Sequence, residues 1–136
     1  MRKLYLFGDL AENFETLVNP FVKQSGGEKA KIVLLIAGGK DWEKHIYIYT
    51  TPMRKNGVNN ISVIVPEKDG STISEDNLRK LKDSTGIFVG GGNTAIYQKI
   101  YCNSKIANLI KDKYKNDIPF AGLSAGAIIT ATIFWE

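Results

Sequence analysis

The sequence predicts a three-layer α/β domain in which helices cover both faces of a mainly parallel sheet. Two observations indicate this fold. The apolar runs are short and mostly continuous instead of alternating, which is typical of strands that are buried on both faces. Segments long enough for crossover helices separate these runs, so that strands and helices alternate along the chain. In such a fold, ligands bind in the crevice beyond the carboxyl ends of the strands.

Five apolar runs, each bounded by glycine or polar turn residues, are the predicted strands. Most are rich in Val, Ile and Leu, as a covered parallel sheet requires. They are KLYLFG from Lys3, KIVLLIAGG from Lys31, ISVIVP from Ile61, GIFVGGG from Gly86 and PFAGLSAG from Pro119.

Four intervening segments are the predicted helices: Asn13–Gln24, Trp42–Asn56, Glu75–Lys82 and Thr94–Lys115. Ser74, followed by two acidic residues, is typical of a helix start. A second helix is expected to begin at Asn103 or Ser104 within the last segment. Apolar residues there fall on one helical face: Ile106, Leu109, Ile110 and Tyr114.

Length and composition favour one α/β domain over residues 1–136, because a chain of 136 residues is in the single-domain range. No apolar run is long enough to span a bilayer, and the first residues lack the pattern of a secretory signal, so we expect a cytoplasmic protein with no membrane partner. Cys102 is the single cysteine, which excludes an internal disulfide. The net charge of +4 comes from lysines spread among acidic residues, so no nucleic-acid partner is expected.

Ser124 lies in the pattern G-x-S-x-G, between a predicted strand and a run of helix formers. This arrangement is typical of a nucleophile elbow, in which a tight turn lifts the serine hydroxyl off the sheet edge. The unpaired N–H groups of the following helix would stabilise an oxyanion beside the serine. The alternative is that Ser124 is only a small residue in a strand-to-helix turn.

A second glycine-rich loop, GGGNTA at residues 90–95, also follows a strand and opens a predicted helix. Its backbone N–H groups could bind an anion, which leaves two interpretations. As a dinucleotide site it lacks an acidic residue at the end of the next strand. As an oxyanion loop, Gly91 or Gly92 would supply an N–H to the same carbonyl oxygen as Ala125, which explains both loops at once.

The residues IFVGGGNTAIYQKIY, followed after a lysine-rich helix by IPFAGLSAGA, resemble the peptidase E and cyanophycinase group of serine peptidases. The match extends from about Thr85 to Ile129 and is looser upstream. The resemblance implies the flavodoxin-like fold of class I glutamine amidotransferases, with residues 1–136 as the N-terminal portion of a peptidase E-like domain. It implies that Ser124 is the nucleophile, that Gly91 or Gly92 and Ala125 form the oxyanion hole, and that Asn93 lies beside the substrate.

The same resemblance implies hydrolysis of small acidic peptides, with no metal or organic cofactor. In the resembled group, the histidine and its acidic partner come after the serine, but no histidine follows Ser124 here. His45 is the single histidine and a weak candidate for the base, and nothing in the spacing of Asp41 or Glu136 recommends either as its partner.

The apolar residues Ile133, Phe134 and Trp135 come directly before the last residue, Glu136, from which we expect either a longer protein or an apolar end buried in a homodimer. Because the base is missing, a non-catalytic ligand-binding or interaction module of the same fold is the alternative to a serine peptidase.

Overall fold

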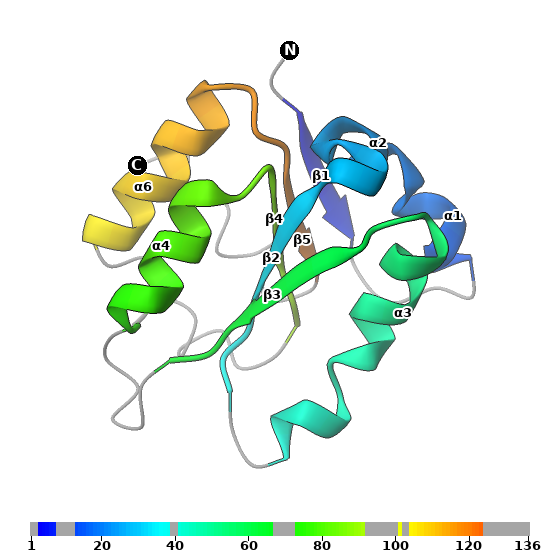
Figure 1. Cartoon of the computed structure of the whole chain (residues 1–136), viewed down its shortest axis with the longest axis horizontal. Coiled ribbons are helices and arrows are strands. Elements are labelled where there is room, and N and C mark those ends of the chain that lie inside the picture. Colours follow the sequence, from blue (N-terminus) through cyan, green and yellow to red (C-terminus); the bar gives the residue numbers. More distant parts are fainter. Residues whose placement is uncertain are drawn as a thin grey trace.

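The structure is a computed structural model that describes residues 3–7, 13–38, 41–66, 73–91, 101 and 104–123. These residues form one sheet between two layers of helices (Figure 1). The strand order is β1-β5-β4-β2-β3, and every neighbouring pair is parallel. The predicted three-layer, flavodoxin-like α/β fold is therefore confirmed. The strands are β1 (Leu4–Phe7), β2 (Lys31–Leu35), β3 (Asn60–Ile64), β4 (Gly86–Val89) and β5 (Phe120–Leu123).

The helices divide between the two faces of the sheet (Figure 1). One face carries α1 (Phe14–Leu17), α2 (Asn19–Ser25) and α3 (Tyr47–Lys55), and the other carries α4 (Glu75–Asp83) and α6 (Ser104–Lys115). Two short 3₁₀ helices, η1 (Gly27–Lys29) and η2 (Trp42–Lys44), lie in the connections.

Each face of the sheet has its own apolar core, because successive side chains of a strand point to opposite faces. In β2, Val33 and Leu35 pack with α4 and α6, whereas Ile32 and Leu34 pack with α1, α2 and α3. All four side chains are buried, with exposed fractions of at most 2%. The continuous apolar run of β2 is thus explained by burial on both sides.

The helix predicted over Asn13–Gln24 is two helices, since α1 ends at Leu17 and α2 begins at Asn19. Pro20 explains the break, because proline has no N–H to donate to the carbonyl four residues earlier. The same residue is well placed at the start of α2, where an N–H would lack a helical partner.

The helix predicted over Trp42–Asn56 is also shorter than expected. Its first part is the 3₁₀ helix η2, and α3 begins at Tyr47. Short 3₁₀ turns are common where an α-helix begins, and the N-cap residue of α3, Ile46, makes no side-chain hydrogen bond to the start of that helix.

The remaining helix predictions agree with the structure where the residues are described. Ser74 caps α4, with its hydroxyl accepting the N–H of Asn77 at 3.1 Å. A helix begins at Ser104, and Ile106 and Ile110 on its apolar face are buried. Residues 94–100, 102 and 103 of the predicted helix lie outside the described residues.

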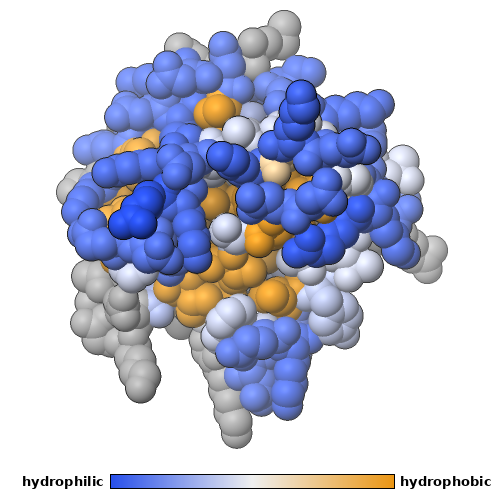
Figure 2. Space-filling view, in the orientation of Figure 1, coloured by the Kyte–Doolittle hydropathy of each residue, from blue (hydrophilic) through white to orange (hydrophobic). Residues whose placement is uncertain are grey.

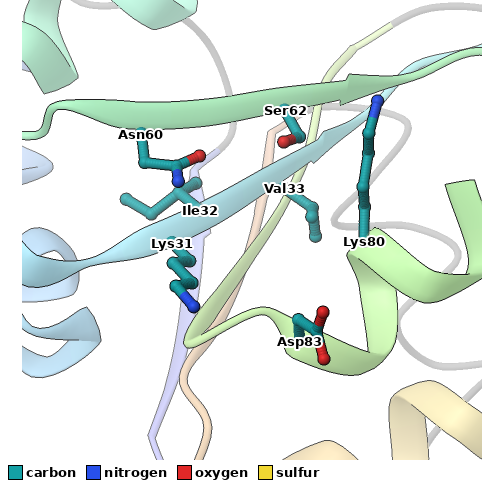
Figure 3. Close-up of a pocket in the computed structure, with 7 residues that line it drawn as sticks. All are labelled: Lys31, Ile32, Val33, Asn60, Ser62, Lys80 and Asp83. Carbon is teal, nitrogen blue, oxygen red and sulfur yellow. The ribbon is translucent and has the colours of Figure 1, made fainter.

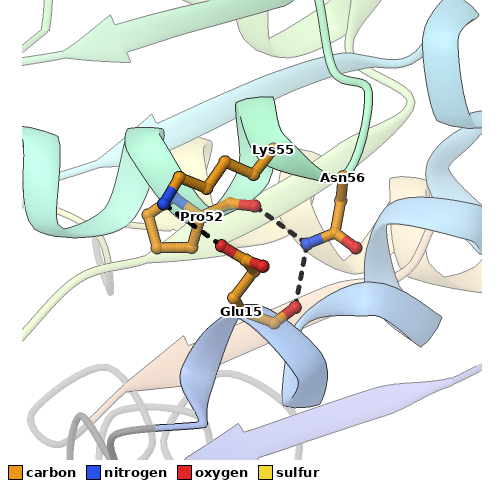
Figure 4. A network of polar contacts seen from close by, with 4 residues as sticks. All are labelled: Glu15, Pro52, Lys55 and Asn56. Carbon is orange, nitrogen blue, oxygen red and sulfur yellow. Dashed lines mark hydrogen bonds and ion pairs between the residues drawn. The ribbon is translucent and has the colours of Figure 1, made fainter.

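A polar network ties α3 to α1 on the surface (Figure 4). The side-chain amide of Asn56 donates to the carbonyl oxygens of Glu15 and Pro52, both at 2.8 Å. The ammonium group of Lys55 lies 3.5 Å from the Glu15 carboxylate. Asn19 donates to the Asn56 side-chain oxygen at 2.6 Å, which adds α2 to the network. These contacts fix the C-terminal end of α3 relative to α1 and α2.

The strand β3 forms one edge of the sheet, and apolar residues reach the surface there. Figure 2 shows this apolar area in the middle of the view, between the polar surfaces of the helices. Ile61, Val63 and Val65 are partly buried against the core on the α3 side.

Candidate active site

The candidate site lies where the parallel strands end, at the lower edge of the sheet in Figure 1. The register pairs Leu35 of β2 with Val89 of β4, and Val89 with Gly122 of β5. Because β4 lies between β2 and β5, the carboxyl ends of these three strands are neighbours in the sheet. This edge is where ligands bind in open parallel sheets.

Two glycines of the GGGN loop are described, and both contact other elements. The N–H of Gly90 donates to the Leu35 carbonyl at 3.0 Å, which continues the pairing of β4 with β2. The N–H of Gly91 donates to the hydroxyl of Tyr49 at 2.9 Å. A Cβ on Gly90 would lie only 3.1–3.3 Å from three atoms of the Tyr49 ring and hydroxyl. Glycine at position 90 therefore allows the tyrosine to approach the backbone closely.

Tyr49 comes from α3 and is only 8% exposed. Its ring packs against Phe88 of β4, with the ring centroids 5.7 Å apart. Burial raises the pKa of the Tyr49 hydroxyl, and the hydrogen bond from Gly91 lowers that pKa by less. The phenol therefore keeps its proton at neutral pH and accepts the Gly91 N–H through a lone pair.

Tyr101 is fully buried and joins the ends of two strands on the opposite face of the sheet. Its hydroxyl donates a hydrogen bond to the carbonyl oxygen of Ile36 and lies 3.1 Å from that of Ile64. Ile36 directly follows β2, and Ile64 is the last residue of β3. The N–H of Ile36 also donates to the carbonyl oxygen of Ile64. Tyr101 thus supports the same carboxyl edge of the sheet that carries the glycine loop.

Replacing Tyr101 with phenylalanine is expected to lower the free energy of unfolding by about 1–3 kcal/mol, because the buried carbonyl of Ile36 would lose its donor. Urea denaturation of the wild-type and variant chains measures the difference. Tyr47→Phe is the matched control, since Tyr47 is 60% exposed and its change should have little effect. Equal stabilities of Tyr101→Phe and wild type would contradict the supporting role.

The residues predicted for the site are only partly described. Gly91 lies at the carboxyl edge as expected from its position after β4. Leu123, the last described residue, directly precedes Ser124. The other predicted site residues, Ser124, Ala125, Gly92 and Asn93, lie outside the described residues, as do Cys102 and Glu136.

The two residues considered as a base and its acidic neighbour lie on the surface. His45 is exposed in the turn between η2 and α3. Asp41 is exposed before η2, and its carboxylate lies 3.8 Å from the ammonium group of Lys44. Neither observation favours a catalytic role for these two residues.

Sequence reasoning did not find the roles of Tyr49 and Tyr101. For Tyr49 a weak signal exists, because Tyr49 and Met53 are four residues apart and share the buried face of α3. A tyrosine on a buried helix face usually finds a hydrogen-bond partner. Its partner, Gly91, is 42 residues away, so only the folded chain identifies it.

An open pocket of about 180 Å³ lies on the α4 side of the sheet (Figure 3). It is formed around the starts of β2 and β3, at the opposite ends of these strands from the glycine loop. The pocket is therefore separate from the candidate site. The residues that line it are Lys31, Ile32, Val33, Asn60, Ser62, Lys80 and Asp83.

The part of the chain that the structure describes lacks two kinds of feature. In that part, no helix is both long enough and apolar enough to cross a membrane. Likewise, the described residues contain no group of three or more His, Cys, Asp or Glu side chains that could hold a metal ion.

The sequence of this chain is similar to that of a family of peptidases. The model of peptidase family S51 matches residues 8–134. The chain belongs to peptidase family S51. Its relatives include a Peptidase E of Shewanella denitrificans, which is 39% identical over 57 residues, or 42% of this chain and 24% of that protein. A Peptidase E of Shewanella putrefaciens is 27% identical over 112 residues, or 82% of this chain and 44% of that protein.

Solved structures share the S51 chain's fold. A crystal structure of a peptidase from an acI-B1 Actinobacterium has a TM-score of 0.71 at 20% identity, covering 96% of this chain and 57% of that one. A putative Peptidase E protein from Listeria monocytogenes has a TM-score of 0.66 at 24% identity, covering 96% of this chain and 62% of that one. Most of this chain is matched by the Shewanella putrefaciens protein and by these two structures, but the chain spans only about half of their length.

Proposed function

We propose that this S51 chain carries the nucleophile and the oxyanion donors of a serine peptidase that hydrolyses small acidic peptides. The observation that carries the proposal is that β4 and β5 are adjacent and parallel. The sequence GGGN directly follows β4, and the sequence GLSAG begins with the last two residues of β5. Family membership supports a peptidase, and the pairing of the two strands that lead to these sequences supports Ser124 as its nucleophile.

Between the two candidates for the oxyanion donor of the glycine loop, the described contacts favour Gly92. The N–H of Gly91 already donates to Tyr49. In the proposed mechanism, the Ser124 oxygen attacks the scissile carbonyl carbon, and the N–H groups of Gly92 and Ala125 stabilise the negative charge that develops on the carbonyl oxygen. Asn93 is proposed to bind the substrate.

The attack requires a base that removes the serine proton. No histidine follows Ser124 in this sequence, and His45 is exposed. We therefore expect residues 1–136 to hydrolyse dipeptides slowly or not at all. Efficient dipeptide hydrolysis by these residues would contradict this expectation.

Fluorophosphonate labelling tests the nucleophile, with imidazole added to the buffer as an external base. We expect slow labelling of Ser124 that becomes severalfold faster with imidazole, because imidazole can take the serine proton. Peptide mass spectrometry identifies the labelled residue, and Ser124→Ala should lose the label. If Ser124 stays unlabelled with imidazole while a control esterase is labelled, the nucleophile assignment is wrong.

A further inference from the structure

We propose that Tyr49 is a positioning residue for the glycine loop: its hydroxyl accepts the Gly91 N–H and holds the backbone from which the oxyanion hole is built. This inference rests on the proposed function, since it assigns Tyr49 a role in the same site. It goes further by placing part of the catalytic apparatus on α3, a helix that contributes none of the residues of the two glycine loops.

The contacts between Tyr49 and the loop involve two consecutive residues. The hydroxyl oxygen lies 2.9 Å from the nitrogen of Gly91. The ring lies so close to Gly90 that a Cβ there would meet the ring at 3.1 Å. One side chain thus fixes both the position of the strand end and the direction of the next N–H group. A hydrogen bond together with a close packing contact restricts the loop more than either would alone.

Tyr49 can serve as a fixed point because its own position is restrained. Its ring packs against Phe88, which is fully buried in the centre of the sheet. One turn further along α3, Met53 is also fully buried. The end of α3 is bound to α1 through Asn56 and Glu15, as seen in Figure 4. The helix that carries Tyr49 is therefore attached to the core at its middle and to α1 at its end.

The chemistry of the phenol suits this role over a wide range of pH. A neutral hydroxyl accepts an N–H without placing a negative charge beside the oxyanion that forms in the reaction. Because burial raises the pKa of Tyr49, the hydroxyl stays neutral throughout the physiological range. Phenylalanine at this position would keep the ring contacts with Gly90 and Phe88 and remove only the acceptor.

Small errors in the position of catalytic groups have large effects on rate, of the order of 100-fold for a displacement of about 1 Å. We therefore expect Tyr49→Phe to reduce the maximal rate of imidazole-assisted labelling of Ser124 by about 10-fold to 100-fold. The probe concentration at half-maximal rate should change by less than about 3-fold, because the loop acts on the transition state more than on binding.

The experiment compares the wild-type chain, Tyr49→Phe and Tyr47→Phe with the same fluorophosphonate. Tyr47 is a matched control because it lies on the same helix and is 60% exposed, so its variant should label like wild type. Amide hydrogen exchange followed by NMR provides a second readout. In Tyr49→Phe the Gly91 N–H should exchange at least about 10-fold faster, while amides in the centre of β2 should keep their wild-type rates.

The outcomes separate the two proposals. If wild type is labelled at Ser124 and Tyr49→Phe is labelled at the same maximal rate, the positioning role is wrong and the proposed function stands. A slower Tyr49→Phe whose β2 amides also exchange faster would likewise overturn the positioning role, since the whole domain would then be destabilised. If wild type is not labelled at Ser124, the proposed function fails and the positioning role fails with it.

Discussion

Replacing Phe88 with alanine is expected to lower the free energy of unfolding by about 3–5 kcal/mol, the usual loss when a buried phenylalanine is removed. Phe88 is fully buried in β4 at the centre of an aromatic cluster. The centroid of its ring lies 5.7–6.3 Å from four other ring centroids, those of Phe7, Phe14, Phe21 and Tyr49. These rings belong to β1, α1, α2 and α3, so one substitution weakens the contacts of four elements.

Urea denaturation followed by circular dichroism measures the loss. Tyr47→Ala is the control, because it removes a ring of similar size from an exposed position on α3 and should change stability by less than about 0.5 kcal/mol. Phe88→Leu should be intermediate, since it keeps most of the apolar volume. If Phe88→Ala and Tyr47→Ala have the same small effect, Phe88 is not at the centre of the core.

Alanine at Gly86 is expected to destabilise the chain by about 3 kcal/mol, at the upper end of the usual range for an overpacked core. The added Cβ would lie 2.2 Å from the hydroxyl oxygen of Ser25 and 2.8 Å from its Cβ. Ser25 is 2% exposed, and its hydroxyl donates to the Phe21 carbonyl at 2.7 Å. Neither β4 nor the end of α2 has free space for a methyl group, so one of them must move.

A double mutant tests whether the collision is the cause. Ser25→Gly removes both atoms that the new Cβ would meet first, so Gly86→Ala should cost less in the Ser25→Gly background than in wild type. Thermal or urea unfolding of the four chains gives the interaction energy. Additive effects of the two changes would show that the loss at Gly86 has another origin.

Much of the fold could be predicted because it depends on local patterns. Each of the five apolar runs overlaps one of the strands β1 to β5 of the described residues. As expected, β2 begins at Lys31 and β4 at Gly86. Ser74 caps α4, since capping depends on residues within one turn of the helix, and α6 has the bounds Ser104–Lys115. The helix predicted over Asn13–Gln24 is instead two helices, because Pro20 lacks the N–H that would continue α1.

The candidate site could be predicted only in part, because sequence motifs identify loops and not the side chains that support them. The sequence indicates Gly91 as a possible oxyanion donor, yet the N–H of Gly91 donates to Tyr49 of α3. Tyr101 supports the ends of β2 and β3 through its hydroxyl, which donates to the carbonyl oxygen of Ile36 and lies 3.1 Å from that of Ile64. The hydrogen bonds of Tyr49 and Tyr101 all join residues more than thirty positions apart, for which no spacing rule exists.

The alternation of strands and helices, the parallel sheet and the family motifs GGGN and GLSAG could be read from the sequence, since these depend on periodicity and short-range residue order. The folded chain sets the order of the strands, which places β4 between β2 and β5. It also decided which buried hydroxyls support the glycine loop and the strand ends. The physical reason is that a buried polar group must find a partner wherever the packed chain provides one, and packing brings together residues that are distant in sequence.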